Sequence, residues 1–388
     1  GGGGRGARRS GVCGAAWRGA RRVAGQLCWE VVPAIDPARV GGDVDRVDER
    51  ARAVDGWVSD GQVVGAGMRV ILSRRTGLHH CAGWLDREQG RPWVPGALCD
   101  IRSMAKPIVA TAALTLAEDG ALGLSDPVSR FLPSFGRDVS RSITVEHLLH
   151  PPAGLDHPGF PARLRSYPDL RAAADDVGRV GPTVEPGSRF RYSDAGSTVL
   201  GAVVAEVAGR PLEEVVSRRV LQPLEMVDTV ADPDPKDARL ASSYKLAGGE
   251  FTRYWKPGDP PKLPFFPGAG GLLSTTSDYA RLLAVWMDGG RSRTARLLRG
   301  HTAAMALRSV PLTRLPEERG NHGMQWWLYS DPAEGEGVQL VFGSDGSDGT
   351  WAMAAPALDL MVLYFSQSRG GGTVFDAMGL VRELLERA

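Results

Sequence analysis

Strand-like patterns lie near both ends of this chain, and helical patterns fill much of the part between them. Near the start, apolar residues recur every three or four positions from Val40 to Val58, which predicts an amphipathic helix. Two strands joined by a tight turn are predicted next, at 65–73 and 77–84. A helix followed by a hairpin indicates an antiparallel sheet covered by helices, because a doubly wound fold alternates strands with helices.

The C-terminal third returns to strand patterns, since residues 337–342, 350–355 and 359–367 alternate or run apolar between turn residues. Apolar residues at helical spacing over 373–387 predict a closing helix. We therefore predict an α/β fold of the α+β type. An antiparallel sheet, flanked by N- and C-terminal helices, would hold an inserted and mostly helical domain.

The predicted sheet domain combines residues 37–100 with 270–388, and the inserted helical domain spans 101–269. Helical patterns in that insertion occupy 103–122, 143–149 and 196–208. Two stretches rich in proline and glycine, 151–186 and 255–271, are predicted as loops. Loops of this length inside a compact protein are typical of covers over a functional site or of linkers.

Residues 1–36 differ from the rest of the chain, with six arginines and no acidic residue before Glu30. Arginines interrupt every apolar run there, so the segment is a poor match to a secretory signal, and a cytoplasmic location is expected. We predict a disordered tail. A basic arm that binds nucleic acid or a membrane is the alternative interpretation.

The charge balance argues against a nucleic-acid-binding protein, and the distribution of apolar residues argues against a membrane-spanning one. Among 388 residues, 46 Lys and Arg stand against 45 Asp and Glu without a long basic stripe, so a nucleic-acid partner is not expected. No run of about 18 apolar residues occurs, so no membrane-spanning helix is expected either.

Metal and disulfide chemistry have no sequence support. The seven histidines form no H-E-x-x-H, and no C-x-x-C pair occurs among the four cysteines, Cys13, Cys28, Cys81 and Cys99. We therefore expect free thiols and no metal site. A G-x-S-x-G is also missing, which argues against the nucleophile elbow of an α/β-hydrolase.

One short motif contains a serine and a lysine at a spacing that suits a nucleophile and its base. Five of the 46 basic residues are lysine, and Lys106 is the only lysine among the first 235 residues. It stands three positions after Ser103 in S-M-A-K, and on the first turn of a helix the amine can reach the hydroxyl. A lysine with a lowered pKa can activate a serine. By itself the motif fits equally well a helix-capping serine followed by a surface lysine.

Four longer blocks extend this motif. They are CDIRSMAKPIVATAALTLAEDGALGLSDPVSRFLPSF, FRYSDAGSTVLGAVVAEVAG, GAGGLLSTTSDYARLLAVWMDGG and FGSDGSDGTWAMAAPALDLMVLYFSQ. Together they resemble the serine β-lactamase and penicillin-binding-protein superfamily, most closely its class C β-lactamase-like branch and the family VIII carboxylesterases. The blocks occur in the order and spacing of that branch from about residue 38 to the C-terminus.

The resemblance implies a role for each matching residue. Ser103 would be the acylated nucleophile, Lys106 its activating partner, and Tyr192 a proton relay whose phenolate a nearby ammonium favours. The oxyanion hole would consist of the N–H groups of Ser103 and Ser347, and Gly346 would let the strand approach the substrate closely.

Three positions depart from the pattern of that branch, and one of them, Pro151-Pro152 in place of a His-Thr/Ser pair, is interpreted as a loop change without chemical consequence. Asp194 stands where asparagine is common, and a carboxylate there would help to hold Lys106 protonated. Ser344 replaces the cation or imidazole of the Lys/His-x-Gly motif, which removes a partner for a substrate carboxylate and favours uncharged esters.

We predict substrate contacts from four residues, Asp194, Ser344, Gly346 and Trp351. Large aromatic side chains near the expected site are candidates for an acyl or aryl pocket, although each one singly is more typical of a core. They are Trp255, Phe265, Phe266, Trp326, Trp327 and Trp351.

The predicted function is hydrolysis of small-molecule, short-chain carboxylic esters through a Ser103 acyl-enzyme, without a cofactor. A β-lactamase, a D-amino-acid peptidase or amidase, and an acyltransferase are alternatives within the superfamily, because they share the same residues. A penicillin-binding-like module that binds a ligand without turnover is the alternative outside enzymology.

Overall fold

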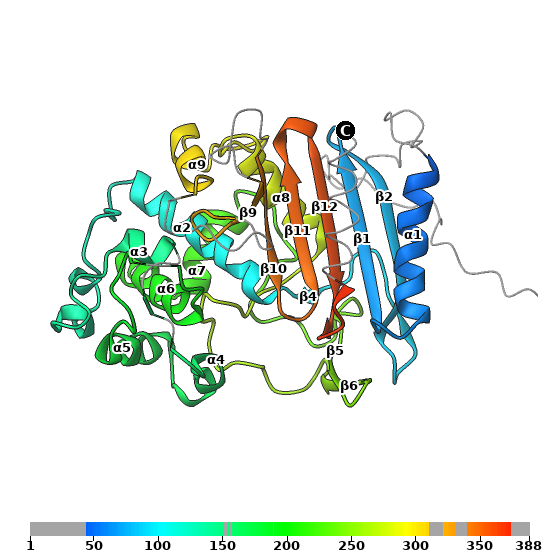
Figure 1. Ribbon diagram of the computed structural model, residues 1–388, viewed down its shortest axis with the longest axis horizontal. Helices are drawn as coiled ribbons and strands as arrows, with labels where there is room; N and C mark the ends of the chain where they lie inside the picture. Colours follow the sequence, from blue (N-terminus) through cyan, green and yellow to red (C-terminus); the bar gives the residue numbers. More distant parts are fainter. Residues whose placement is uncertain are drawn as a thin grey trace, which may run out of the picture.

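The structure is a computed structural model that describes residues 44–150, 154–155, 157–188, 190–309, 321–330 and 340–373. Its centre is an eight-stranded sheet with strand order β3-β2-β1-β12-β11-β10-β9-β8, in which every neighbouring pair is antiparallel (Figure 1). The first strands are β1 (Gly65–Leu72), β2 (Arg75–Asp86) and β3 (Arg91–Pro92). The last ones are β8 (Asn321–His322), β9 (Trp327–Ser330), β10 (Val341–Gly346), β11 (Thr350–Ala355) and β12 (Leu360–Ser366).

The two ends of the chain meet in the middle of this sheet. Strand β1 pairs with β12 from Ala66 opposite Ser366 to Leu72 opposite Leu360. The pairing confirms the predicted antiparallel sheet, in which a strand from near the start of the chain lies beside one from near its end.

Successive side chains along a strand point to opposite faces of the sheet, and apolar side chains form a core on each face. On β12, Val362 and Tyr364 pack with Val54 of helix α1 (Val44–Ser59), which lies against β1 and β2 (Figure 1). The intervening Leu363 and Phe365 belong to the larger core on the other face. Helix α8 (Thr276–Met287) packs there against β11 and β12.

Helix α2 (Ala105–Glu118) connects the sheet to the helical part of the molecule. All twelve residues from Ala105 to Leu116 are buried, as expected for a helix that is packed on every side. The other helices of this part are α3 (Val145–Leu149), α4 (Phe160–Arg163), α5 (Leu170–Val180), α6 (Asp194–Ala208) and α7 (Leu212–Val216). Helix α9 (Gly300–Ala306) follows α8 in the chain.

Two small sheets flank the start of α2. Strand β4 (Cys99–Asp100) pairs with β7 (Leu273–Ser274), and a 3-10 turn over Arg102–Met104 then leads into the helix. The second small sheet has the order β13-β5-β6 and consists of β5 (Ser243–Ala247), β6 (Glu250–Trp255) and β13 (Ser368–Arg369). None of the described helices is both long and apolar enough to cross a membrane.

Several predicted boundaries need correction. The loop prediction for 151–186 is wrong in its second half, where Asp169 caps α5 by accepting a hydrogen bond from the Ala172 N–H. The strand predicted at 337–342 is instead β10, which runs to Gly346. The predicted N-terminal tail lies outside the described residues, and so does the predicted closing helix after Thr373.

Gly346 is a position where the fold has no room for a side chain. A Cβ atom there would lie 2.4 Å from the Ile101 carbonyl oxygen and 2.3 Å from Thr350 Oγ1. The missing side chain therefore lets β10 contact the backbone that precedes the 3-10 turn.

We expect Gly346→Ala to lower the free energy of unfolding by about 1–3 kcal/mol, because the new methyl group must displace backbone atoms. Gly56→Ala, inside α1 with no atom within 4 Å of the added Cβ, should instead be neutral or stabilising by up to about 1 kcal/mol. Urea denaturation of both variants tests this, and equal midpoints would contradict the close approach at Gly346.

Candidate active site

Ser103 and Lys106 lie next to each other at the junction between the 3-10 turn and α2. The Lys106 Nζ donates a hydrogen bond of 2.9 Å to the Ser103 Oγ. Ser103 is partly exposed, whereas the Lys106 side chain is only 3% exposed. The geometry therefore favours the nucleophile-and-partner interpretation over a surface lysine.

Tyr192 approaches the same ammonium from the start of α6. The Lys106 Nζ donates to the Tyr192 hydroxyl at 2.7 Å, so one ammonium links this phenol to the Ser103 hydroxyl. Ser193 fixes the local backbone, because its hydroxyl accepts from the Gly196 N–H at 2.9 Å and donates to the Leu155 carbonyl. Three groups from two helices thus form one hydrogen-bonded set.

Asp194 completes the coordination of the ammonium, with its Oδ1 at 2.6 Å from the Lys106 Nζ. Burial alone lowers the pKa of Lys106, but Tyr192 and the Asp194 carboxylate outweigh burial and raise that pKa above its ordinary value. The predicted effect of an acid at this position is therefore present. A lysine held as an ammonium donates protons and does not accept them at rest.

The pKa of the Tyr192 phenol is also shifted. Burial raises its pKa, the Lys106 ammonium opposes the rise, and the Asp194 carboxylate adds to it, so that the pKa lies above its ordinary value. The Tyr192 residue as a whole remains 38% exposed, so part of it lies at the surface of the site.

The turn between β10 and β11 brings Ser347 towards the nucleophile. The Gly349 N–H donates to the Gly346 carbonyl at 3.0 Å, which closes a four-residue turn with Ser347 as its second residue. The N–H of that residue is not used by such a turn. Gly346, the chain neighbour of Ser347, contacts the backbone at Ile101, so this turn lies beside the 3-10 turn that carries Ser103.

Ser344 lies beneath the nucleophile turn. Ser344 is 4% exposed and lies close to Tyr279, whose hydroxyl donates to the Met104 carbonyl at 3.1 Å. This placement supports the turn from below but does not present the Ser344 hydroxyl to solvent.

Trp351 contradicts the prediction of a substrate contact. It is 1% exposed and belongs to the core on the α1 face of the sheet, where its indole N–H donates to the Tyr329 hydroxyl at 3.0 Å. Trp351 pairs with Asp345, one position from Gly346, and alternation therefore turns its side chain away from the nucleophile.

The other aromatic candidates separate into different environments. Trp327 stacks on Tyr192 with ring centroids 5.8 Å apart, and His322 contacts Trp327 edge-on at 4.8 Å. Trp326 is fully buried in the core, and Phe265 and Phe266 line a different groove beside α6 and α7. Trp255 lies under the Lys262 ammonium, 4.7 Å from Nζ to the ring centroid.

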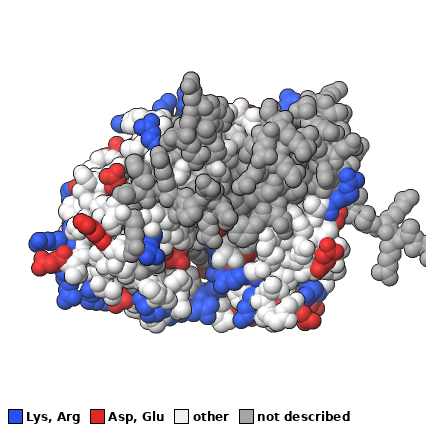
Figure 2. All heavy atoms as spheres, in the orientation of Figure 1, with Lys and Arg blue, Asp and Glu red and all other residues white. Residues whose placement is uncertain are grey.

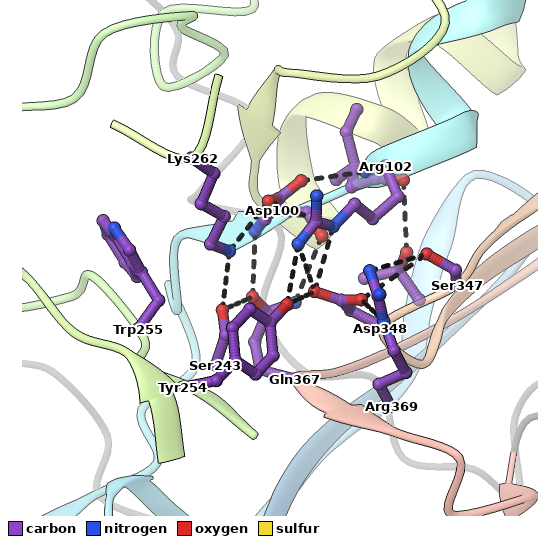
Figure 3. Close-up of polar contacts among 12 residues, drawn as sticks. Asp100, Arg102, Ser243, Tyr254, Trp255, Lys262, Ser347, Asp348, Gln367 and Arg369 are labelled. Carbon is purple, nitrogen blue, oxygen red and sulfur yellow. Dashed lines mark hydrogen bonds and ion pairs between the residues drawn. The ribbon is translucent and has the colours of Figure 1, made fainter. Parts of the chain in front are cut away.

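A charged cluster beside the nucleophile turn was missed in the sequence. Arg102, Arg369 and Tyr254 converge on Asp348, and Lys262 binds Asp100 at 2.8 Å (Figure 3). The scarcity of lysine that singled out Lys106 could also have drawn attention to Lys262. No motif pairs positions as distant as 102 and 348.

Acids and bases are interspersed on the face of the molecule in Figure 2. Within the described ranges, no three His, Cys, Asp or Glu side chains converge as they would around a metal ion. The arrangement of Ser103, Lys106 and Tyr192 is suited to acyl transfer through the serine.

Comparisons with known proteins agree on the fold and the superfamily. The chain matches the Beta-lactamase family over residues 45–386. Protein Rv1367c of Mycobacterium tuberculosis is 30% identical over 333 residues, which cover 74% of this chain and 81% of that protein. Esterase EstB of Burkholderia gladioli is 33% identical over 290 residues, 64% of this chain and 72% of that protein.

Two solved structures share the architecture. The hydrolase EstCE1, described as having promiscuous acyltransferase activity, superposes with a TM-score of 0.68 at 24% identity, over 84% of this chain and 95% of that one. A class C β-lactamase from Rhodobacter sphaeroides gives 0.69 at 20% identity, over 88% and 99% of the two chains.

Buried histidines beside the site predict acid sensitivity. Burial lowers the pKa of His322 to about 3 and, together with neighbouring His147, that of His150 to about 4. Below an unfolded pKa of about 6.5, the unfolded chain binds protons at both residues that the folded chain does not. Burial raises the pKa of Asp278 to about 6, which acts in the opposite direction.

Burial also lowers the pKa of His79 to about 4, so we expect the free energy of unfolding to fall by about 2–3 kcal/mol per pH unit between pH 6 and 5. His322→Gln should flatten this slope, whereas His301→Gln, at an exposed position of α9, should leave it unchanged. Denaturant titrations at several pH values measure the slopes. A His322→Gln slope equal to that of the wild type would contradict the assignment.

Proposed function

Because the chain belongs to the beta-lactamase family of serine hydrolases, we propose that it hydrolyses short-chain carboxylic esters through an acyl-enzyme on Ser103. The observation that carries the proposal is the Lys106 ammonium, within hydrogen-bond distance of Ser103, Tyr192 and Asp194. A serine hydroxyl needs such partners to lose its proton during attack.

In the acylation step, the Ser103 oxygen attacks the ester carbonyl carbon while its proton passes to the Tyr192 oxygen. The reactive form carries an ammonium on Lys106 and a phenolate on Tyr192, and the ammonium stabilises the phenolate. The N–H groups of Ser103 and Ser347 donate to the negative oxygen of the tetrahedral intermediate. Cleavage of the ester C–O bond then releases the alcohol with the proton from Tyr192.

In the deacylation step, Tyr192 removes a proton from water as the water oxygen attacks the acyl carbon. Collapse of the second tetrahedral intermediate releases the Ser103 oxygen, which recovers its proton from Tyr192. The products are the carboxylic acid and the free enzyme. Entry of an alcohol in place of water would give acyl transfer with the same residues.

Two observations support esters over charged β-lactams or peptides. Ser344 is buried and uncharged at the position where the superfamily places a cation or imidazole for a substrate carboxylate. Two of the similar proteins are named as an esterase and as a hydrolase with acyltransferase activity.

Replacement of the nucleophile tests the proposal. We expect wild-type turnover of p-nitrophenyl butyrate, a loss of at least about 10³-fold in Ser103→Ala, and a single fluorophosphonate adduct in the wild type alone. Ser59→Ala, at the exposed end of α1, should behave as the wild type. Turnover that survives in Ser103→Ala would refute the assignment, and an adduct without ester turnover would favour the β-lactam and amide alternatives.

The carboxylate at position 194 should be visible in the pH dependence of kcat/KM. Asp194 raises the pKa of both Lys106 and Tyr192, so Asp194→Asn should move both limbs of the profile to lower pH. Glu206→Gln, on the same helix and paired with Arg171, is the matched control and should not move them. An unchanged profile in Asp194→Asn would contradict the coupling.

A further inference from the structure

Asp348 is the centre of the charged cluster beside the nucleophile turn (Figure 3). Its side chain is fully buried. The Oδ2 atom accepts from the Arg102 Nε at 3.0 Å and from the Tyr254 hydroxyl, and the Oδ1 atom accepts from the Arg369 Nε at 2.6 Å. A second Arg102 nitrogen, Nη2, lies 2.9 Å from Oδ2, so that the pair has two contacts.

The ion pair joins the chain neighbours of the two oxyanion donors. Arg102 directly precedes Ser103, and Asp348 directly follows Ser347. The pair therefore links the backbone on either side of the proposed oxyanion hole, over 246 positions of sequence.

Arg102 has a backbone conformation that needs such support. Its φ is 50°, in the left-handed region that residues with a side chain rarely adopt. Asp100 provides a second anchor, because its Oδ1 accepts from the Arg102 N–H at 3.1 Å and its Oδ2 lies 3.2 Å from Nε. Strain of this kind persists where surrounding contacts over-determine the conformation.

The charges of the pair are well defined. Burial raises the pKa of Asp348, but the Arg102, Lys262 and Arg369 cations outweigh burial and hold it below the ordinary value. Both partners are therefore ionised at neutral pH. Removal of Arg102 would leave Asp348 with Arg369 as its paired cation, and removal of Asp348 would leave Arg102 with Asp100 alone, so either change weakens the balance of buried charge.

We propose that the Arg102–Asp348 ion pair is a clamp that sets the spacing between the N–H groups of Ser103 and Ser347. Both are positioning residues, since each acts through its chain neighbour and neither is placed against the reacting atoms. The inference rests on the proposed function in one respect, that these two N–H groups form the oxyanion hole.

The first test is Asp348→Asn, which keeps the size of the side chain and removes its charge. We expect kcat to fall about 10- to 100-fold, with KM within about threefold of the wild type, because misplaced donors affect the transition state more than substrate binding. The second-order rate of fluorophosphonate labelling at Ser103 should fall by a similar factor, since phosphonylation also develops charge on an oxygen in that hole.

Asp86→Asn is the matched control. Asp86 is also fully buried and binds an arginine, Arg253, at 2.7 and 2.8 Å, but its chain neighbours are not oxyanion donors. The control should lose stability while kcat of the folded enzyme stays within about twofold of the wild type. An Asp348→Asn enzyme that is folded and has wild-type kcat and labelling rate overturns the clamp, and so does an equal loss of kcat in the control.

Two further variants keep the inference testable. If Asp348→Asn does not fold, Tyr254→Phe removes one donor from Asp348 and should lower kcat about threefold with KM unchanged. If the wild type neither turns over esters nor labels, the proposed function fails, and the clamp is judged from unfolding of Arg102→Lys, Asp348→Asn and the double variant. The clamp is supported if the unfolding equilibrium constant of the double variant differs by about fivefold or more from the value expected by combining the effects of the two single substitutions. If the two effects simply combine, the clamp is overturned.

Discussion

The structure depends on a buried ammonium with a complete set of acceptors. A lysine ammonium has three donors, and Lys106 directs them to Ser103, Tyr192 and Asp194. Burial of an unpaired charge is costly, so the position is tolerable only when the first residue of α6, Asp194, supplies the carboxylate and Tyr192, just before that helix, supplies the phenol. The packing of α2 against α6 and the assembly of the site are therefore one event, because the ammonium has no comparable partners when the two helices separate.

Close backbone approach is the second condition for the site. Twelve consecutive buried residues of α2 leave no solvent-exposed face over that stretch, so the polar group of Lys106 must find its partners inside the protein. Gly346 permits β10 to contact the backbone at Ile101, and β12 brings the C-terminal part of the chain next to β1. The sheet thus joins segments more than 200 positions apart, and the site geometry depends on that pairing.

The sequence patterns predicted correctly those features that depend on interactions between residues close together in the chain. The hairpin of β1 and β2, the antiparallel sheet and the Ser103–Lys106 contact all follow from period, turn residues or short spacing. The failures lie where the tertiary context dominates. Residues 343–346 read as a turn because they are small or polar, yet they form the end of β10, a strand that contacts the nucleophile turn. The face of Trp351 depended on the register of a hairpin whose turn the sequence did not locate.

Two ionic groups flank the nucleophile, one through the residue before it and one through the residue three positions after it. Arg102 is bound to Asp348 and Asp100, and Lys106 is bound to Asp194. Buried ion pairs are weak contributors to stability, since apolar side chains of similar volume are often at least as favourable. What such pairs provide here is direction, because charge-assisted hydrogen bonds fix both partners in a narrow geometry. A nucleophile on a short 3-10 turn, rather than inside a long helix, needs that constraint from both sides.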